Sequence, residues 1–371
     1  MDGRSNDGRV RYAVVGLGHI AQVAVLPAFR HAAENSELAA LVSGDPKKLK
    51  KLGKKYGVSN TCSYDEFDSL AKSGDIDAVY IALPNHKHCE FTLRAAHAGA
   101  HVLCEKPMAV SEDECRQMIE ACARGGVRLM IAYRLHFEEA NLKAIEIVQS
   151  GKIGEPRYFE SSFSMQVKQE NIRVRSDMGG GPLYDIGVYC INAARNLFRA
   201  EPEEVFCRTA SGDDPRFTDI DEMACATLRF PGARLASFTC SFGAADVSAY
   251  RIVGAAGDLA VEPAYDYQVK LAHRLTVDGK THKENFSKRD QFAPELIHFS
   301  ASILEGREPE PSGAAGLADV RIINALFRSA REGRPVRIEA VPQPERPSPE
   351  LERRRPPVAK EELVHAESGS Q

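Results

Sequence analysis

The sequence lacks the long apolar runs, the paired metal ligands and the one-sided charge that mark several large protein classes. It contains no run of about 18 apolar residues, so no segment is expected to span a membrane. A formal net charge of −4 over 371 residues gives no basic stripe for nucleic acid. The polar start of the chain runs directly into an apolar strand without a secretion signal, so we do not expect export.

The nine cysteines include no CxxC pair and show no spacing typical of zinc ligands. Most of them lie inside apolar runs, where a reduced thiol behaves as a small hydrophobic group. An odd number of cysteines without a secretion signal favours a cytoplasmic protein with reduced thiols, no disulfide framework and no metal site.

The length of the chain and its 43% hydrophobic residues are enough for two separate cores. In the first 133 residues, short apolar runs alternate with amphipathic stretches. This β/α alternation predicts a parallel sheet with helices on both faces, in a dinucleotide-binding domain over residues 1–133. The strand candidates are Tyr12–Val15, Leu38–Val42, Ala78–Ala82, His101–Cys104 and Arg128–Ala132.

The chain changes character after residue 133. A helix candidate, Ala140–Ser150, is followed by successive strand candidates without helices between them, which predicts an antiparallel or mixed sheet. A helix near Ala315–Arg331 closes this second α/β domain, residues 134–335. Residues 340–371 hold six of the twenty prolines and no aromatic residue. Such a segment cannot bury enough apolar surface to offset its ordering entropy, so we expect a disordered tail.

A glycine-containing turn lies between the first strand candidate and a helix, in the pattern GxGxxG/A. The first glycine, Gly16, permits the tight turn, and Gly18 lets the main chain approach a pyrophosphate. Ala21 is small enough for close packing of helix on strand, and the helix start at His19 and Ile20 supplies amide donors. The pattern alone also occurs for packing reasons, but its place at the first strand favours a dinucleotide.

The end of the second strand candidate bears on cofactor choice. An NAD-specific site usually has an acidic residue here, which binds the ribose 2′-hydroxyl. This chain has Ser43 at that place, and Lys47 and Lys48 follow within a turn. A hydroxyl and ammonium groups suit a 2′-phosphate, so the sequence favours NADP. In the alternative, the lysines are a solvated helix face and Asp45 binds the ribose.

The segment Glu105-Lys106-Pro107 follows the strand candidate His101–Cys104. Ligands of open parallel sheets bind beyond the carboxyl ends of the strands, so Lys106 is expected beside the nicotinamide. Near a cationic ring and partly desolvated, its pKa should fall into a range useful for proton transfer. The proline restricts the lysine backbone and allows a cis bond. The alternative is a surface lysine in a turn.

A glycine loop, residues 178–182, leads into a helix candidate that carries Asp185 and Tyr189. The two are four residues apart, hence neighbours on one helical face. A tyrosine beside a lysine is a plausible acid/base for a sugar hydroxyl, because the ammonium stabilises the phenolate. At helical spacing alone, such residues are more often surface and core. Arg173 and Arg175 could line a polyol pocket or lie on a surface loop.

These elements resemble the family of glucose-fructose oxidoreductase, inositol dehydrogenase and rhizopine catabolism proteins over roughly residues 10–335. Tyr189 stands where many relatives have histidine, as in the glucose-fructose oxidoreductase and the dihydrodiol or xylose dehydrogenase branches. The resemblance implies that Lys106 and Tyr189 form the proton-transfer pair, with Asp185 as their partner. It also implies a cofactor site that includes Pro84, Asn85, His88, Glu105, Lys106 and Arg134. For His88 itself, a role in helix packing or in the structure of the cofactor loop is favoured, and contact with the substrate is the alternative.

The resemblance implies a Rossmann domain followed by an α/β domain whose open, mostly antiparallel sheet joins subunits into a dimer or tetramer. It also implies an NADP-dependent sugar oxidoreductase of the glucose-fructose oxidoreductase type, which moves hydride between the nicotinamide and a sugar carbonyl or C1. An ordinary NADP-dependent aldose or dihydrodiol dehydrogenase is the competing enzyme. A nucleotide-sensing regulator on the same fold is the non-enzymatic alternative, against which the presence of both Lys106 and Tyr189 argues.

Overall fold

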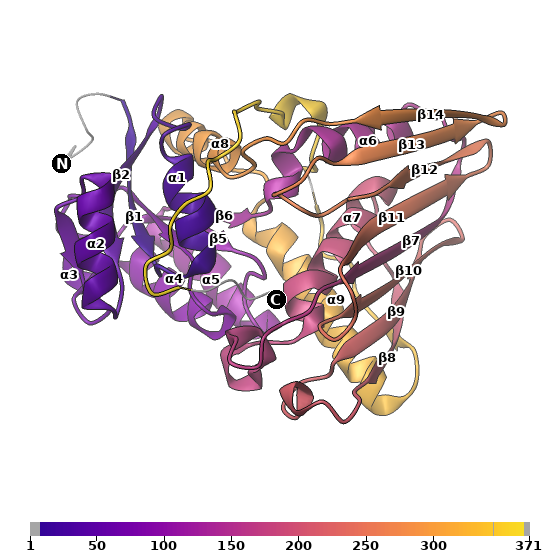
Figure 1. Ribbon diagram of the computed structural model, residues 1–371, viewed down its shortest axis with the longest axis horizontal. Helices are drawn as coiled ribbons and strands as arrows, with labels where there is room; N and C mark the ends of the chain where they lie inside the picture. The colour runs from indigo at the N-terminus through magenta and orange to yellow at the C-terminus, as the bar shows by residue number, and fades with distance from the viewer. Residues whose placement is uncertain (1–7, 344, 367–371) are drawn as a thin grey trace.

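The computed structural model describes residues 8–343 and 345–366, which form two sheets with helices packed on and between them (Figure 1). The N-terminal sheet is parallel and has six strands in the order β3-β2-β1-β4-β5-β6. This is the strand order of a Rossmann fold, and it confirms the predicted parallel sheet. Its strands are β1 (Val10–Val15), β2 (Ser36–Val42), β3 (Asn60–Cys62), β4 (Ala78–Ile81), β5 (His101–Glu105) and β6 (Leu129–Ala132).

The central strands of this sheet are buried on both faces, which explains their continuous apolar runs. The helices of the domain begin and end at typical capping residues: Asp45 and Ser111 accept main-chain N–H groups at two helix starts, and Gly57 and Gly126 end the same two helices. The helices between the strands are α1 (Leu26–Ala28), α2 (Pro46–Tyr56), α3 (Phe67–Lys72), α4 (His88–His97) and α5 (Glu112–Gly125).

One helix from the second half of the chain packs on a face of the first sheet. Helix α8 (Ala293–Glu305) packs against β1 and β2. The hydroxyl of Ser300 lies 2.8 Å from those of both Tyr12 and Ser36, inside the interface. The parallel sheet needs an apolar layer on each face, and α8 supplies part of one. The strands of the two sheets lie on either side of the boundary predicted at residue 134. Helix α8 comes after this boundary in the chain but packs on the first sheet.

The second sheet has nine strands in the order β14-β13-β12-β11-β7-β10-β9-β8-β15, and all neighbouring pairs are antiparallel except β7 with β10. The mixed, mostly antiparallel sheet is confirmed. Strand β9 alternates buried and exposed residues, so one face is packed and the other is outward. The strands are β7 (Pro156–Ser164), β8 (Glu204–Ala210), β9 (Met223–Phe230), β10 (Arg234–Ser241), β11 (Val247–Gly254), β12 (Gly257–Val261), β13 (Ala272–Val277), β14 (Lys280–Asn285) and β15 (Val336–Arg337).

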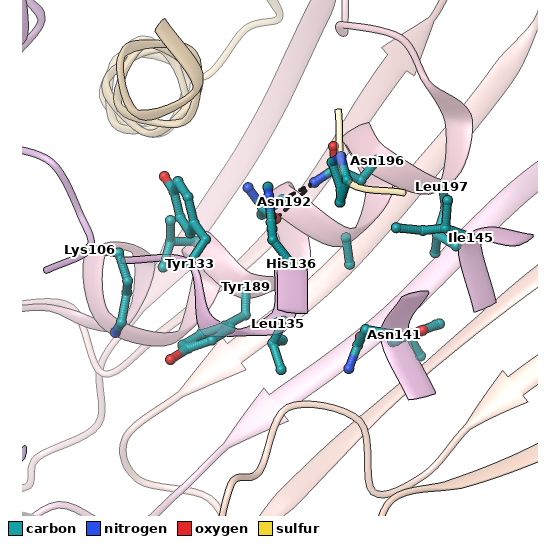
Figure 2. Close-up of a pocket in the computed structure, with 14 residues that line it drawn as sticks. Lys106, Tyr133, Leu135, His136, Asn141, Ile145, Tyr189, Asn192, Asn196 and Leu197 are labelled. Carbon is teal, nitrogen blue, oxygen red and sulfur yellow. Dashed lines mark hydrogen bonds between the residues drawn. The ribbon is translucent and has the colours of Figure 1, made fainter. Parts of the chain in front are cut away.

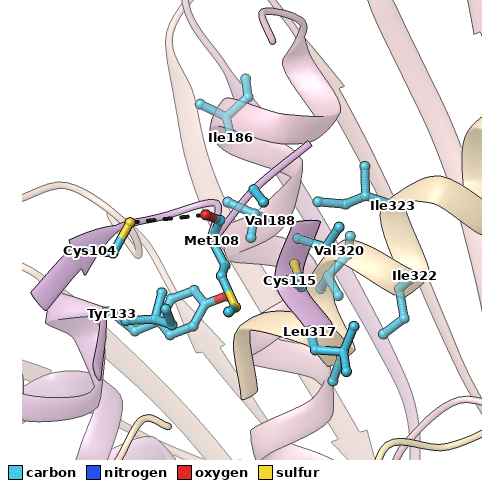
Figure 3. Packing of buried hydrophobic residues seen from close by; sticks show 14 of the residues in the cluster. Cys104, Met108, Cys115, Tyr133, Ile186, Val188, Leu317, Val320, Ile322 and Ile323 are labelled. Carbon is cyan, nitrogen blue, oxygen red and sulfur yellow. Dashed lines mark hydrogen bonds between the residues drawn. The ribbon is translucent and has the colours of Figure 1, made fainter. Parts of the chain in front are cut away.

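Helices α6 (Glu139–Gln149), α7 (Val188–Phe198) and α9 (Gly313–Glu332) lie between this sheet and the Rossmann domain. Their shared core contains Met108, which follows the Lys106 segment and packs among Tyr133, Val188 and residues of α9 (Figure 3). A Cβ on Gly316 of α9 would lie 2.8 Å from Met108, so glycine is needed for this close approach. The segment carrying Lys106 is thus fixed by packing from both domains.

Residues 345–366, here called the C-terminal strap, contain one short turn, η8 (Pro349–Leu351), which packs on α6 of the second domain, and then run onto the N-terminal domain (Figure 1). Composition predicts disorder for residues 340–371, of which 344 and 367–371 lie outside the described residues. The described strap differs from that prediction because the rest of the chain supplies its partners. Leu351 and Val364 pack on the apolar cluster around α8, and Arg346 forms a 2.6 Å ion pair with Glu201.

Within residues 8–343 and 345–366, no helix is long and apolar enough to cross a membrane. The nine cysteines are free thiols, and most are buried. The same described residues contain no group of three or more His, Cys, Asp or Glu side chains arranged to hold a metal ion.

Candidate active site

The glycine turn after β1 has the geometry that the sequence predicts. Gly16 has a φ of +94°, and a Cβ there would lie 2.5 Å from the carbonyl oxygen of Ala82. A Cβ on Gly18 would have no protein atom within 4 Å, so protein packing does not require glycine at this position. Ala21 is fully buried at the start of the following helix, η1 (Ala21–Val25). A turn with main chain open at Gly18 beside a helix start fits a dinucleotide pyrophosphate.

The end of β2 carries a buried serine and a capped helix. The Ser43 hydroxyl accepts the N–H of Asp45 at 3.2 Å. Asp45 accepts the N–H groups of Lys47 and Lys48 at 2.8 and 3.2 Å, and its other oxygen lies 3.1 Å from the His365 imidazole. Both carboxylate oxygens of Asp45 are therefore engaged within the protein. Lys48 is half-buried beside this turn, whereas Lys47 is exposed.

Lys106, Asp185 and Arg173 form a partly buried ion cluster at the end of β5. The Lys106 ammonium lies 2.8 Å from the main-chain oxygen of Asp185 and 3.3 Å from its carboxylate. Arg173 donates to the other carboxylate oxygen at 2.6 Å. Burial alone would raise the pKa of Asp185, but the charges of Arg173 and Lys106 outweigh it and hold that pKa well below its usual range. Asp185 is thus a carboxylate at neutral pH.

The pKa of Lys106 is raised, and this corrects the fall that the sequence analysis expects. Burial favours a lower pKa, but the negative charge of Tyr189 as phenolate, of Asp185 and of Glu105 outweighs it. The expected fall rested on a cationic nicotinamide, whereas the protein groups around the amine act in the opposite direction. Lys106 is therefore an ammonium at neutral pH. The Lys106–Pro107 bond is cis.

Tyr189 lies on α7 with two basic groups close to its ring. The Lys106 nitrogen is 4.8 Å and the Arg134 guanidinium carbon 5.0 Å from the ring centroid. Figure 2 shows the hydroxyl end of Tyr189 on the side of the Lys106 ammonium. Asp185 precedes Tyr189 by one turn, on the π-helical segment η6 (Leu183–Gly187) that leads into α7. The structure thus brings together Lys106, Asp185 and Tyr189.

Arg134, expected among the cofactor-binding residues, is buried between two tyrosine rings. It follows β6 at the start of the short helix η3 (Arg134–Phe137). Its guanidinium donates to the Gln291 side chain and to the carbonyl of Tyr265, and lies 5.3 Å from the ring centroid of Tyr267. The Arg134 side chain therefore packs against the ring of Tyr189.

The segment from Pro84 to His88 connects loops of the site. His88 is fully buried, with Nδ1 2.9 Å from the Pro107 oxygen and Nε2 2.9 Å from the Leu83 oxygen. Burial lowers its pKa. Asn85, which follows Pro84 in the turn η2 (Asn85–Lys87), donates to the carbonyl of Gly179 at 2.7 Å. In the protein, both side chains position main-chain segments of the site, and for His88 this agrees with the favoured packing role.

Two further carboxyl groups lie beneath the Lys106 segment. The hydroxyl of Tyr80 donates to Glu105 at 2.9 Å, and burial raises the pKa of Glu105. Glu295 of α8 is fully buried, and neither of its oxygens has a hydrogen-bond partner. Burial, together with the charge of Glu105, raises the pKa of Glu295 well above its usual range, so this group is a neutral acid.

The two arginines considered for a polyol pocket have different places. Arg173 binds Asp185, and its charge adds to burial in lowering the pKa of His19 on the glycine turn. Arg175 forms a pair with Asp177 at 2.7 Å on the exposed surface.

Tyr267, Gln291 and Glu295 also belong to the surroundings of the site, although no sequence motif indicates them. Tyr267 and Gln291 lie in or near loops that surround the helix α8, far along the chain from the motifs. No local pattern marks them, because their role follows only from the return of α8 to the first sheet.

The chain matches two family models. Residues 10–133 match an oxidoreductase family with an NAD-binding Rossmann fold, and residues 141–260 match the C-terminal domain of the GFO/IDH/MocA proteins. A D-xylose 1-dehydrogenase [NADP(+)] of Haloarcula marismortui is 32% identical over 343 residues, which are 90% of this chain and 95% of that protein.

Solved structures give the same result. An aldose-aldose oxidoreductase from Caulobacter crescentus, complexed with glycerol, aligns with a TM-score of 0.85 and 38% identity, covering 89% of this chain and 100% of that one. A 3-ketoreductase from Actinomadura kijaniata, in complex with NADP and TDP-benzene, aligns with a TM-score of 0.79 and 26% identity, covering 86% and 98%. With both domains matched in order, this chain belongs to the Gfo/Idh/MocA family of oxidoreductases.

Proposed function

We propose that this protein is an NADP-dependent sugar oxidoreductase of the glucose-fructose oxidoreductase type, which oxidises one aldose at C1 and reduces a second sugar at its carbonyl. The observation that carries the proposal is the partly buried cluster of Lys106, Asp185 and Tyr189 at the carboxyl end of β5. Similarity to an aldose-aldose oxidoreductase and to NADP-dependent xylose dehydrogenases supports an aldose as substrate.

NADP fits the residues at the end of β2. Ser43 stands where an acidic residue would repel a 2′-phosphate, and the nearby Asp45 carboxylate is engaged in capping α2. The ammonium of Lys48 can reach toward a phosphate at this turn, and the open main chain at Gly18 suits the pyrophosphate. When bound, the nicotinamide supplies the acceptor for hydride from the sugar and, once reduced, the donor of hydride to the second sugar.

The proton steps belong to Tyr189 and Lys106. In oxidation, the Tyr189 phenolate takes the proton of the C1 hydroxyl as hydride leaves C1, and a lactone forms. The Lys106 ammonium beside the ring stabilises the phenolate that this step requires. In reduction, Tyr189 returns the proton to the carbonyl oxygen of an open-chain sugar, which becomes an alditol. Two aldoses thus yield one lactone and one alditol, with no net change of cofactor.

Asp185 and Arg134 position this pair. Asp185 holds the Lys106 ammonium through its carboxylate and its main-chain oxygen, and Arg173 fixes that carboxylate from the other side. Arg134 packs under the Tyr189 ring and is itself held by Gln291. Because these side chains are partly buried, their electrostatic contacts are stronger than they would be in water.

The proposal is tested with protein purified without added nicotinamide. Supplied with D-xylose alone, the protein should form xylonolactone and xylitol in equal amounts, without external NADP. Formation of product only when NADP is added, with NADPH accumulating in solution, would show instead an ordinary aldose dehydrogenase. The similarity to the xylose dehydrogenases favours that second candidate.

The outward face of the nine-stranded sheet supports a homodimer or homotetramer. Tyr158 of β7 and Leu235 of β10 are exposed large hydrophobic residues that lie opposite each other on neighbouring strands at the middle of the sheet. Adjacent exposed apolar side chains on an open sheet are typical of an interface. Sedimentation of wild type and of Leu235→Glu tests it, and a monomeric wild type would contradict it.

A further inference from the structure

The C-terminal strap ends beside the two segments that are proposed to hold NADP. Gln22, on the helix after the glycine turn, donates to the carbonyl of Val364 at 2.9 Å and accepts its N–H at 2.7 Å. The same amide donates to Leu17 inside the turn at 3.0 Å. The next residue, His365, lies 3.1 Å from the carboxylate of Asp45, at the start of α2. The strap therefore spans from the pyrophosphate turn to the adenosine-ribose turn.

Ion pairs attach the strap along its path to these turns. Glu361 lies 2.6 Å from the ammonium of Lys55 and 3.7 Å from Arg30, and its side chain is only 10% exposed. Upstream, Arg355 donates to the main-chain oxygen of His31 at 2.9 Å. In Figure 1 the strap passes in front of α1 toward the end of the N-terminal domain that carries α2.

The strap also satisfies a buried polar group. Gln22 is 1% exposed, and its amide oxygen accepts the N–H of Val364. Detachment would break the two hydrogen bonds that join Gln22 to Val364. Docking is therefore favoured by the N-terminal domain itself, and a ligand enclosed by the docked strap would favour it further.

We propose that the C-terminal strap is a cofactor-retaining element, which closes over the adenosine end of bound NADP and must detach before the cofactor leaves. The inference rests on the proposed NADP binding at Gly18 and Ser43, but not on recycling between two sugars. Because binding linkage is reciprocal, bound NADP must hold the strap as strongly as the strap holds NADP. The strap thereby gives the enzyme a way to keep one nicotinamide through many turnovers.

The test reverses one attachment and follows cofactor release. Glu361→Lys places a cation against Lys55 and Arg30, whereas Glu120→Lys, in an exposed pair with Arg124 on α5, is the matched control. NADPH fluorescence after a chase with excess NADP gives the dissociation rate. We expect about tenfold faster release from Glu361→Lys, equivalent to about 1.4 kcal/mol. Glu120→Lys should match wild type, and adding Lys55→Glu to Glu361→Lys should restore slow release.

Trypsin cleavage after the exposed Arg353 and Arg354 reports whether the strap is attached. NADPH should slow this cleavage in wild type. If the strap of Glu361→Lys remains protected, Val364→Pro, which removes the N–H bound to Gln22, serves as the second variant. Unchanged NADPH release from a variant whose strap is cleaved rapidly would overturn the proposal. So would faster cleavage in the presence of NADPH, because the strap would then compete with the cofactor. No sugar is used, so failure of recycling leaves this result intact.

Discussion

Replacing Asp185 with asparagine should move the alkaline limit of catalysis to lower pH. The Lys106 ammonium lies 3.3 Å from the Asp185 carboxylate, and the cluster is mostly buried. At an effective dielectric constant of about 20, the attraction between unit charges at this distance is about 5 kcal/mol. Part of this is lost to screening. The remainder still exceeds the roughly 1.4 kcal/mol that shifts a pKa by about one unit.

The direction of the pKa shift follows from the charges around Lys106. In wild type the pKa of Lys106 is raised, because Tyr189, Asp185 and Glu105 together outweigh burial. In Asp185→Asn, burial and the charge of Arg173 remain while the carboxylate is gone, so the pKa of Lys106 falls. The ammonium that stabilises the Tyr189 phenolate is then lost at lower pH. The kcat of the variant should decline at least about one pH unit earlier than that of wild type.

The assay is the pH dependence of kcat under saturating aldose, for wild type, Asp185→Asn and Asp177→Asn. Asp177 precedes Asp185 by eight residues and forms an exposed pair with Arg175. The same substitution at Asp177 therefore changes the charge without touching Lys106. Its profile should match that of wild type. An alkaline limb that is unmoved in Asp185→Asn would refute the assignment of Asp185 as the group that holds Lys106 charged.

Three other substitutions test the remaining parts of the site. Tyr189→Phe and Lys106→Met should each lower kcat by roughly 10² while NADPH affinity changes little; near-normal turnover in Tyr189→Phe would remove the tyrosine from the mechanism. Ser43→Asp should shift the ratio of kcat/KM for NADP to kcat/KM for NAD toward NAD, and a wild type that already favours NAD would contradict the NADP assignment. Gly16→Ala should lower Tm and weaken NADP binding, because its Cβ would lie 2.5 Å from the Ala82 oxygen; titration calorimetry that gives the wild-type affinity would contradict this.

The sequence predicted those elements whose pattern is local. The Rossmann strands have continuous apolar runs, and the predicted and observed bounds of β5 differ by one residue. Strand β3 was not predicted, because Asn60–Cys62 is short and half-buried throughout. Strand β14 is exposed at every position, so Lys280–Asn285 has no hydrophobic alternation to detect. It is held by pairing with β13 alone.

The site residues likewise divide into those that a local sequence pattern indicates and those that it does not. Gly16, Lys106 and Tyr189 stand in motifs that can be read from neighbours in the chain. The place of Arg173 depends on a loop that folds back onto Asp185, and nothing local separates it from the surface Arg175. The raised pKa of Lys106 depends on Asp185 and Tyr189, which lie about 80 residues farther along the chain, as well as on the neighbouring Glu105. The C-terminal strap is polar by composition and gains order only from partners such as Gln22 and Lys55.

The central claim is that one bound nicotinamide serves both half-reactions, and transfer of an isotope tests it most directly. The protein is given an aldose deuterated at C1, together with an excess of unlabelled NADP and NADPH in solution. The account predicts that deuterium removed from C1 appears in the alditol without dilution by the external pool. Alditol that carries hydrogen from the external NADPH, with deuterium accumulating in the free cofactor, would contradict it.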